Sequence, residues 1–480
     1  MSKVVIDVWV PDLTFPGWMD RWFQLGRDFE KVYPRYEVRV QGKDFWTFPQ
    51  EVSRAAAAGT PPTLAELYFY MGQVARDLRH ADGSPLFTSV EKAVAGRSEI
   101  NGEPVVLGDL MTPFREYYTV GGDLMSMPSV CTTSLLYANT ELLEKAGVTE
   151  LPQTWAEVTA VCEQIARAKG GPKHAITWSN HGTFYQQAVA TQGGLLVNNN
   201  NGRGGRATEA ELASKEMLAW AEIWRDLHRD GHYLHTGGIP DWAQTLRAFA
   251  EQDVAIRISS SNDVNYMVQA AKDNGFGIEV GLFPFSDTQP YVGNAIAGTS
   301  MWLTSGLDEA TQDGALTFLQ YMHNARNAAD RHKANSFAPV THASFDLLER
   351  EGWFEQHPYH RVASDHVTRF PAKAVRPDGV PADAVPAQQG AVFGDFAGNQ
   401  DVMTRAMGDV LRGADPITRF TQATEEAQAL LDTYNAYALG DWPRDPDGPN
   451  SSHKVEYFTT LMAGRDYSAA DLENVVKLNR

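Results

Sequence analysis

The stretch "LLYANTELLEKAGV", residues 135–148, joins an apolar strand to a short helix. The side chain of Asn139 can cap the start of this helix, and Gly147 can adopt the left-handed conformation that ends it. A buried strand followed at once by a helix is typical of alternating α/β structure.

A second helix is predicted a few residues further on, in "LPQTWAEV", residues 151–158. Thr154 and Glu157 have the spacing of a capping box, in which each side chain bonds the other residue's backbone N–H. The apolar residues after the cap recur at helical spacing and form one stripe: Trp155, Val158, Val161 and Ile165. A new α/β unit therefore begins here.

The N-terminal part reads as strand, helix, strand, helix and strand. These elements are predicted at residues 4–10, 18–32, 36–41, 48–59 and 63–70. Such an order favours a largely parallel sheet that is covered on both faces. Later strands are predicted at 253–259, 277–285 and 296–305, and later helices at 308–324 and 416–439.

Two segments have loop composition. "NNNNGRGGR", residues 198–206, has the Asn and Gly content of a mobile surface connection. "FPAKAVRPDGVPADAVPAQQG", residues 370–390, is rich in proline and is predicted to run extended over the surface.

Composition limits the classes of function. A chain of 480 residues exceeds one ordinary core, so two lobes are expected. The formal net charge of −19 repels phosphate backbones and anionic headgroups, which argues against nucleic acid as a partner. The apolar runs are much shorter than the roughly 20 residues that span a bilayer.

The cysteines and the first residues bear on the compartment. Cys131 and Cys162 belong to no Cys-x-x-Cys pair and are predicted to be free, buried thiols. The start "MSKVVIDVWV" reads as a strand rather than a signal peptide. The protein is therefore expected to be extracytoplasmic if a signal was removed, and cytoplasmic if Met1 is the native start.

Catalytic signatures are not evident. The sequence contains no Gly-x-Ser-x-Gly elbow, His-Glu-x-x-His helix or phosphate-binding Gly-Lys loop. "GFGIEVG", residues 275–281, precedes a strand and so does not fit a dinucleotide turn. "HPYHR", residues 357–361, is interpreted as a surface turn, because Pro358 prevents the helical spacing of a metal-binding His pair. No cofactor, metal or catalytic residue is predicted.

In order along the chain, five stretches resemble a known family: "AAAAGTPPTLAELY", "SMPSVCTTSLLYANTELLEKAGVTELPQTWAEV", "AIAGTSMWLTSG", "ANSFAPVTHASFDLLEREGWFEQHP" and "GDFAGNQDVMTRAMGDVLRG". The chain is similar to extracellular solute-binding proteins of sugar-type ABC importers, above all to the glycerol-3-phosphate and glycerophosphodiester subgroup. The resemblance implies a two-lobed α/β periplasmic-binding fold of the maltose-binding type with a cleft at the hinge. Residues 1–128 and 297–338 would form the N-terminal lobe, and residues 129–296 and 339–480 the C-terminal lobe.

The resemblance also implies which residues contact the solute. A sugar needs hydrogen-bond partners for its hydroxyls and aromatic rings for its C–H faces. The matching positions are Asp12, Phe45, Trp46, Tyr70, Thr132, Trp178, Asn180, His181, Phe184, Ser260, Ser261, Gly298, Thr299, Phe337, Asp395 and Phe396. The aromatic residues among them could instead serve packing, and Asp12 could cap a helix.

One departure from the subgroup affects the ligand. Phe396 stands where a phosphate-holding Arg is expected, and a phenyl ring cannot supply charge-assisted donors. The expected ligand is therefore a neutral glycoside, an oligosaccharide or an amino sugar rather than glycerol 3-phosphate. The expected protein is a monomeric, non-enzymatic receptor that delivers its solute to ABC permease subunits. A cytoplasmic enzyme or sensor acting on a saccharide remains an alternative, because fold does not fix function.

Overall fold

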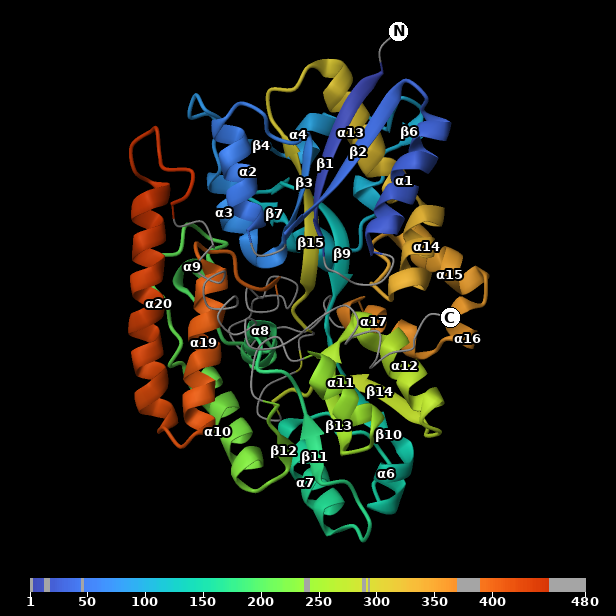
Figure 1. Cartoon of the computed structure of the whole chain (residues 1–480), viewed down its shortest axis with the longest axis vertical. Helices are drawn as coiled ribbons and strands as arrows, with labels where there is room; N and C mark the ends of the chain where they lie inside the picture. Colours follow the sequence, from blue (N-terminus) through green and yellow to red (C-terminus); the bar gives the residue numbers. More distant parts are fainter. Residues whose placement is uncertain are drawn as a thin grey trace.

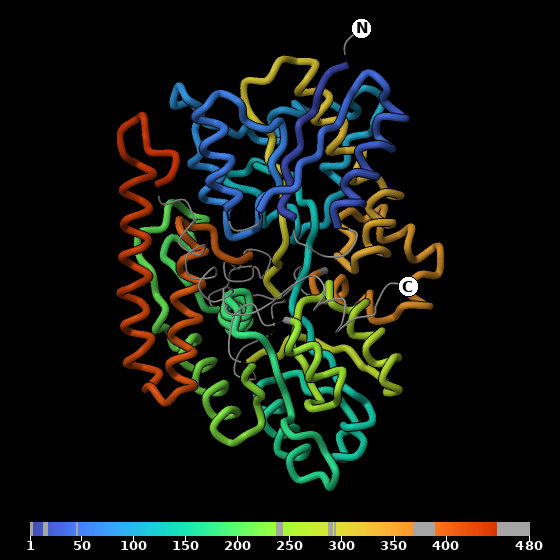
Figure 2. Tube along the Cα trace, viewed as in Figure 1, coloured from blue at the N-terminus to red at the C-terminus, as the bar shows by residue number. Residues whose placement is uncertain are grey.

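The computed structural model describes residues 3–12, 18–44, 47–236, 242–286, 291, 294–368 and 389–448. Two halves, each built on its own β-sheet, lie end to end (Figure 1). In Figure 2 the trace passes between them several times, so each half combines segments that are far apart in the sequence.

The first half contains a six-stranded sheet in which β1 lies parallel to both β2 and β3. The strand β15 joins it antiparallel to β3, β4 and β9. The strands are β1 (Val4–Asp12), β2 (Tyr36–Asp44), β3 (Leu64–Tyr68), β4 (Phe87–Thr88), β9 (Met127–Thr132) and β15 (Ala297–Thr304).

The second half contains a five-stranded sheet. The strand β11 is parallel to β12 and β13, whereas β10 is antiparallel to β13 and β14. The strands are β10 (Ser134–Asn139), β11 (His174–Thr177), β12 (Tyr233–Leu234), β13 (Val254–Ser260) and β14 (Ile278–Leu282). The parallel arrangement predicted for the N-terminal strands is confirmed for β1, β2 and β3. One strand in each sheet, β15 in the first and β10 in the second, runs opposite to the others, which was not predicted.

Helices surround the sheets, and α20 runs along one side of the molecule, beside α19, up to the level of the first half (Figure 1). The helices from the segments of the first sheet are α1 (Trp18–Val32), α2 (Phe48–Ala57), α3 (Gly72–Asp77), α4 (Val90–Val94), α5 (Thr112–Tyr117), α13 (Glu309–Met322) and α14 (Ala325–Asn335). Those from the segments of the second sheet are α6 (Thr140–Lys145), α7 (Trp155–Arg167), α8 (Gly182–Ala190), α9 (Asn198–Asn201), α10 (Lys215–Arg229), α11 (Trp242–Ala250) and α12 (Val264–Asp273). The C-terminal ones are α15 (His342–Arg350), α16 (Trp353–Gln356), α17 (Tyr359–Thr368), α19 (Phe396–Leu411) and α20 (Pro416–Ala438).

Shorter elements complete the halves. The strand pairs are β5 (Glu99–Ile100) with β6 (Glu103–Pro104), and β7 (Thr119–Val120) with β8 (Asp123–Leu124). The 3₁₀ turns are η1 (Phe69–Met71), η2 (Leu107–Asp109) and η3 (Ser261–Asp263).

The helix ends predicted from the sequence are confirmed. The Asn139 side chain accepts a hydrogen bond from the Leu142 backbone N–H, and Gly147 has φ +75°. Thr154 and Glu157 form a complete capping box at the start of α7. Both cysteines are buried and unpaired, also as predicted.

Replacing Thr154 with alanine should lower the free energy of unfolding by about 1 kcal/mol, because the backbone N–H of Glu157 loses its acceptor. Urea unfolding followed by circular dichroism measures this change. Thr433→Ala is the control, since its hydroxyl only returns a bond to a carbonyl within α20. A Thr154 variant as stable as the control variant would contradict a role for the cap.

An aromatic cluster fills the second half beneath α7 and α10. Its central ring is Trp178, which is fully buried and lies 4.4 Å from the Tyr233 ring centroid and 5.1 Å from that of Trp224.

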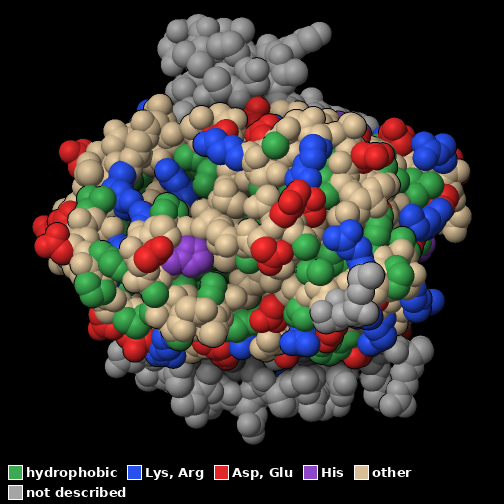
Figure 3. All heavy atoms as spheres, turned by 90° about the horizontal axis from the view of Figure 1, so that it is seen from above, with side chains coloured by type: hydrophobic (Ala, Val, Ile, Leu, Met, Phe, Trp, Pro, Cys, Tyr) green, Lys and Arg blue, Asp and Glu red, His purple; other side chains and the backbone are tan. Residues whose placement is uncertain are grey.

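None of the helices in the described ranges is long and apolar enough to cross a membrane. Figure 3, a view onto the end formed by the first half, shows acidic and basic side chains interspersed.

Two interpretations of loops need correction. Residues 198–206 are not a free surface connection, because Asn201 is buried and the guanidinium of Arg203 donates to backbone carbonyls of Tyr117, Gln389 and Gly390. His360 does not lie in a surface turn but is 5% exposed at the start of α17. The proline-rich stretch 370–390 lies almost entirely outside the described residues.

Candidate functional site

The candidate site lies where the chain passes from one sheet to the other. Thr132 ends β9 opposite Ala297 of β15, and the backbone N–H of Thr133 donates to the Ser261 hydroxyl at 3.1 Å. The N–H of Ser261 in turn donates to the Thr133 carbonyl at 2.8 Å. The first crossing is therefore fastened to the end of β13, where Ser260 and Ser261 lie.

Two further segments meet this crossing, namely residues 295–297, which lead into β15, and residues 337–338. The Ala338 N–H donates to the Cys131 carbonyl at 2.9 Å, which places Phe337 beside the first crossing. The Phe337 ring packs edge-on against Trp18, with the centroids 6.0 Å apart. Thr132, Ser260, Ser261, Gly298, Thr299 and Phe337 are thus brought to one region, which we call the hinge group.

Gly298 allows β9 and β15 to approach each other closely. Its φ is +128°, and a Cβ atom there would lie 1.9 Å from the Val130 carbonyl oxygen. The register of the two strands shifts just after it, between Thr299 and Ser300. Glycine is required at this position for steric reasons.

A second group joins the end of β3 to the start of α19. Phe69 contacts both Tyr70, at 5.2 Å, and Phe396, at 6.2 Å between ring centroids. Asp395 is the N-cap of α19 and accepts from the Gly398 N–H at 3.0 Å. Tyr70, Asp395 and Phe396 thus come from segments more than three hundred residues apart in sequence and lie together.

The remaining predicted contacts surround α8. Asn180 donates to the Thr404 carbonyl at 3.0 Å, and its amide oxygen accepts from Tyr185 at 2.6 Å. His181 caps α8 by accepting from the Thr183 N–H through Nδ1. Phe184 is buried against Phe283, and Trp178 lies inside the aromatic cluster. The positions of Phe184 and Trp178 fit packing better than contact with a solute.

Asp12 ends β1, next to Asp44 of β2, at the sheet edge to which β3 also points. Phe45 and Trp46 lie outside the described residues. The carboxyl ends of parallel strands are the edge at which α/β proteins bind ligands. The proposed solute contacts at these three positions stay predictions.

A buried carboxylate that was not predicted lies one layer below this edge. Glu66 is fully buried in β3, and its Oε1 accepts a hydrogen bond from the Thr299 hydroxyl at 2.6 Å. Burial raises the pKa of Glu66, while Thr299, Ser129 and the charge of Arg331 act in the opposite direction. A single Glu in an otherwise apolar strand, "TLAELY", is the signal that could have identified it.

Two partly buried arginines of this region donate to backbone carbonyls. Arg331 donates to the carbonyls of Ser129 and Met322, at 2.7 and 3.2 Å. Arg203 donates to the carbonyls of Gln389 and Gly390, at 2.6 and 2.7 Å. Neither guanidinium is therefore available as the bidentate clamp that a phosphate prefers.

The side chains of the candidate site are polar or aromatic. Hydroxyls, amides and carboxylates lie beside tyrosine and phenylalanine rings, which suits a hydroxyl-rich molecule. Within the described ranges, no group of three His, Cys, Asp or Glu side chains could hold a metal ion.

Two α/β halves joined by several crossings, with polar residues gathered at the crossings, define the two-lobed periplasmic-binding fold. The sequence profile of the bacterial extracellular solute-binding protein family matches residues 24–361. The chain belongs to this family.

Known relatives place the chain more closely. It is 28% identical over 321 residues to the sn-glycerol-3-phosphate-binding periplasmic protein UgpB of Yersinia pseudotuberculosis, covering 64% of this chain and 71% of that protein. The UgpB protein of Pectobacterium atrosepticum is 24% identical over 434 residues, or 87% and 90% of the two chains.

Solved structures share the fold. Mycobacterium tuberculosis UgpB in complex with glycerophosphocholine matches with a TM-score of 0.65 and 19% identity, covering 90% of this chain and 99% of that one. The cyclic alpha-maltosyl-1,6-maltose binding protein of Arthrobacter globiformis matches with a TM-score of 0.66 and 16% identity, over 90% and 99% of the chains. The predicted two-lobed, maltose-binding-type fold is confirmed.

Proposed function

We propose that the protein is the extracytoplasmic receptor of an ABC importer and captures a neutral carbohydrate-type solute between its two halves. The observation that carries this proposal is the hinge group. Strands from both sheets meet there, and the crossing at Thr132 and Thr133 lies beside β15, the end of β13 and the Phe337 segment. A solute held by both halves binds the closed form better than the open form, and that difference drives closure.

The neutral character of the solute is supported by two features. Phe396 is fully buried among Phe69 and Phe393, so this position offers no charge-assisted donor. The nearby guanidiniums of Arg203 and Arg331 are held by carbonyls. Proteins of this fold bind phosphate-containing and neutral solutes: one structure holds glycerophosphocholine, and another is of an alpha-maltosyl saccharide binding protein.

The lobe boundaries at residues 128/129, 296/297 and 338/339 are part of the proposal. The first falls inside β9, which pairs with β15 of the first sheet, while the chain reaches the second sheet after Thr133. A boundary at Thr133 therefore describes the sheets better.

Homologues are binding proteins, and we propose that this chain likewise returns its solute unchanged and passes it to permease subunits.

A thermal-shift screen tests the ligand class. Maltose, methyl glucoside, glucosamine and glycerol 3-phosphate would be added at the same concentration, up to millimolar. A neutral or amino-containing saccharide should raise the melting temperature by a few degrees, since ligand at about 100 times its dissociation constant adds ~2.7 kcal/mol to the free energy of unfolding. Glycerol 3-phosphate should leave the melting temperature unchanged.

Chromatography of the recovered saccharide separates receptor from enzyme. An unaltered saccharide supports the receptor, and a converted one supports the enzyme alternative. Stabilisation by glycerol 3-phosphate alone would show that the interpretation of Phe396 is wrong.

A further inference from the structure

The carboxylate of Asp77, at the end of α3, is the centre of a buried polar cluster. Arg206 binds it through two nitrogens, Nη2 to Oδ1 at 2.6 Å and Nη1 to Oδ2 at 3.0 Å. The Tyr434 hydroxyl donates to Oδ2 at 2.8 Å, and Arg444 donates to the Asp77 backbone carbonyl at 2.8 Å. Asp77 is 7% exposed, so these bonds form largely away from water.

The partners of Asp77 come from outside the first sheet's own segments. The helix α3 follows β3 of the six-stranded sheet, whereas Arg206 lies between α9 and α10, and α10 packs against β12 of the five-stranded sheet. Tyr434 lies near the end of α20, the helix that runs up to the level of the first half (Figure 1). Asp77 therefore connects the two halves at a place separate from the crossings.

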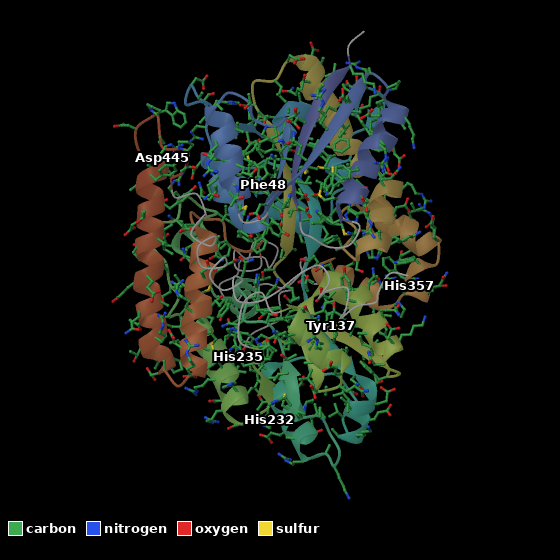
Figure 4. The ribbon with its side chains drawn as sticks, in the orientation of Figure 1. Phe48, Tyr137, His232, His235, His357 and Asp445 are labelled. Carbon is green, nitrogen blue, oxygen red and sulfur yellow. The ribbon has the colours of Figure 1, made fainter. Side chains whose placement is uncertain are left out.

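Neighbouring contacts extend the connection. After α20 the chain returns to the first half, where the Trp442 indole donates to the Ala81 carbonyl at 3.0 Å. Arg54 of α2 pairs with Asp447 at 2.5 Å. Figure 4 shows Asp445 of the same segment beside the first half, at the upper end of α20. The C-terminal part of the described chain thus lies against α2 and α3.

This cluster is coupled to the candidate site through two elements. The turn η1, which carries Tyr70, leads directly into α3, and α19, which starts at Phe396, packs along α20. Fixing Asp77 to Tyr434 therefore fixes the two elements that bring Tyr70 and Phe396 together. A buried, two-pronged ion pair has one well-defined geometry, and removing one partner leaves the other charge uncompensated.

We propose that Asp77 is a positioning residue that holds the two halves, through Arg206 and Tyr434, in the arrangement that the structure shows, and that this arrangement is the closed one. This inference rests on the two-lobed receptor function proposed above. The clamp stabilises the closed arrangement before solute arrives, and its loss shifts the population towards an open one.

The test measures the separation of the halves without any solute. Spin labels at the exposed residues Arg27 and Glu144, replaced by cysteine, report one distance across the halves, and small-angle scattering gives the radius of gyration. In Asp77→Asn the ratio of open to closed molecules should rise about tenfold or more. Asp82→Asn is the matched control, because this carboxylate is exposed and accepts only from Ser84 within its own turn.

Two further variants keep the test decisive. Tyr434→Phe removes one donor, leaves the ring in place, and should open the molecule less than Asp77→Asn; it serves alone if Asp77→Asn does not fold. Asp77→Glu should restore part of the closed population. Distances in Asp77→Asn, or in Tyr434→Phe alone, that match those of the wild type would overturn the clamp. The distance measurements contain no solute, so they do not depend on the ligand class. A negative saccharide screen would refute the proposed ligand class but would not change what the distances say about the clamp.

Discussion

Gly298→Ala is expected to lower the free energy of unfolding by roughly 4 kcal/mol, enough to unfold a marginally stable receptor. Two costs add at this residue. The backbone at φ +128° is unfavourable for any residue with a side chain, and the new Cβ would overlap the Val130 carbonyl oxygen at 1.9 Å. Either β9 and β15 separate, or the backbone of Gly298 moves, and both changes disturb the hinge group.

Urea unfolding of Gly298→Ala would be compared with that of Gly147→Ala. Gly147 also has a left-handed φ, +75°, but no atom lies within 4 Å of its would-be Cβ. The control therefore carries only the conformational cost, about 1 kcal/mol. If the free energy of unfolding fell equally in the two variants, the close approach of β9 and β15 would not matter for stability.

Local signals explain which parts of the fold could be predicted from the sequence. The caps at Asn139 and Thr154 each join residues three positions apart, so the sequence contains the whole interaction. The pairing of β3 with β15 instead joins Glu66 to Met301, and nothing local specifies it. For that reason the sequence does not predict the antiparallel strand of each sheet, β15 and β10.

The same distinction applies to the candidate site. Thr132, Ser261 and Gly298 were named through a resemblance, and the structure brings them together at the crossings. Their contact with a solute stays a prediction. Glu66 was missed because burial of a lone carboxylate depends on Thr299 and Arg331, which lie far away in sequence.

Residues 198–206 show how composition can mislead. Asparagine and glycine are typical of loops, and the prediction gave no weight to the two arginines between them. Arg203 and Arg206 hold this segment by donating to Gln389, Gly390 and Asp77. The left-handed backbone of Asn199 and Asn200 is what Asn tolerates best, so the composition reflects geometry rather than mobility.

Acidification is expected to destabilise the protein through a pair of buried histidines. The rings of His332 and His360 lie 5.9 Å apart, and His357, labelled in Figure 4, lies 5.4 Å from His360. His332 donates to the Phe337 carbonyl through Nδ1, and His360 bonds the Asn265 side chain through Nε2. The second nitrogen of each ring has no hydrogen-bond partner in the described structure.

Burial therefore lowers the pKa of His332 to about 4 and that of His360 to about 3, from the ordinary 6.5. Between pH 6.5 and these values the unfolded chain binds protons that the folded protein does not, so stability falls as the pH falls. At one pKa unit per ~1.4 kcal/mol, lowering the pH from 7 to 4.5 should cost roughly 4 to 5 kcal/mol for the two residues together.

The double variant His332→Asn and His360→Gln isolates this contribution. Asn can replace the Nδ1–H donor and Gln the Nε2–H donor, and neither side chain titrates in this range. The free energy of unfolding is measured with urea at pH 7 and at pH 4.5. Between these two pH values it should fall by several kcal/mol less in the double variant than in the wild type. His342→Asn, a substitution at the start of α15 outside this pair, is the control and should keep the wild-type loss. If the double variant lost as much stability as the wild type, this pair would not be the source of the acid sensitivity, which would have to arise from groups common to both proteins, such as the carboxylates and His323, whose pKa burial lowers to about 3.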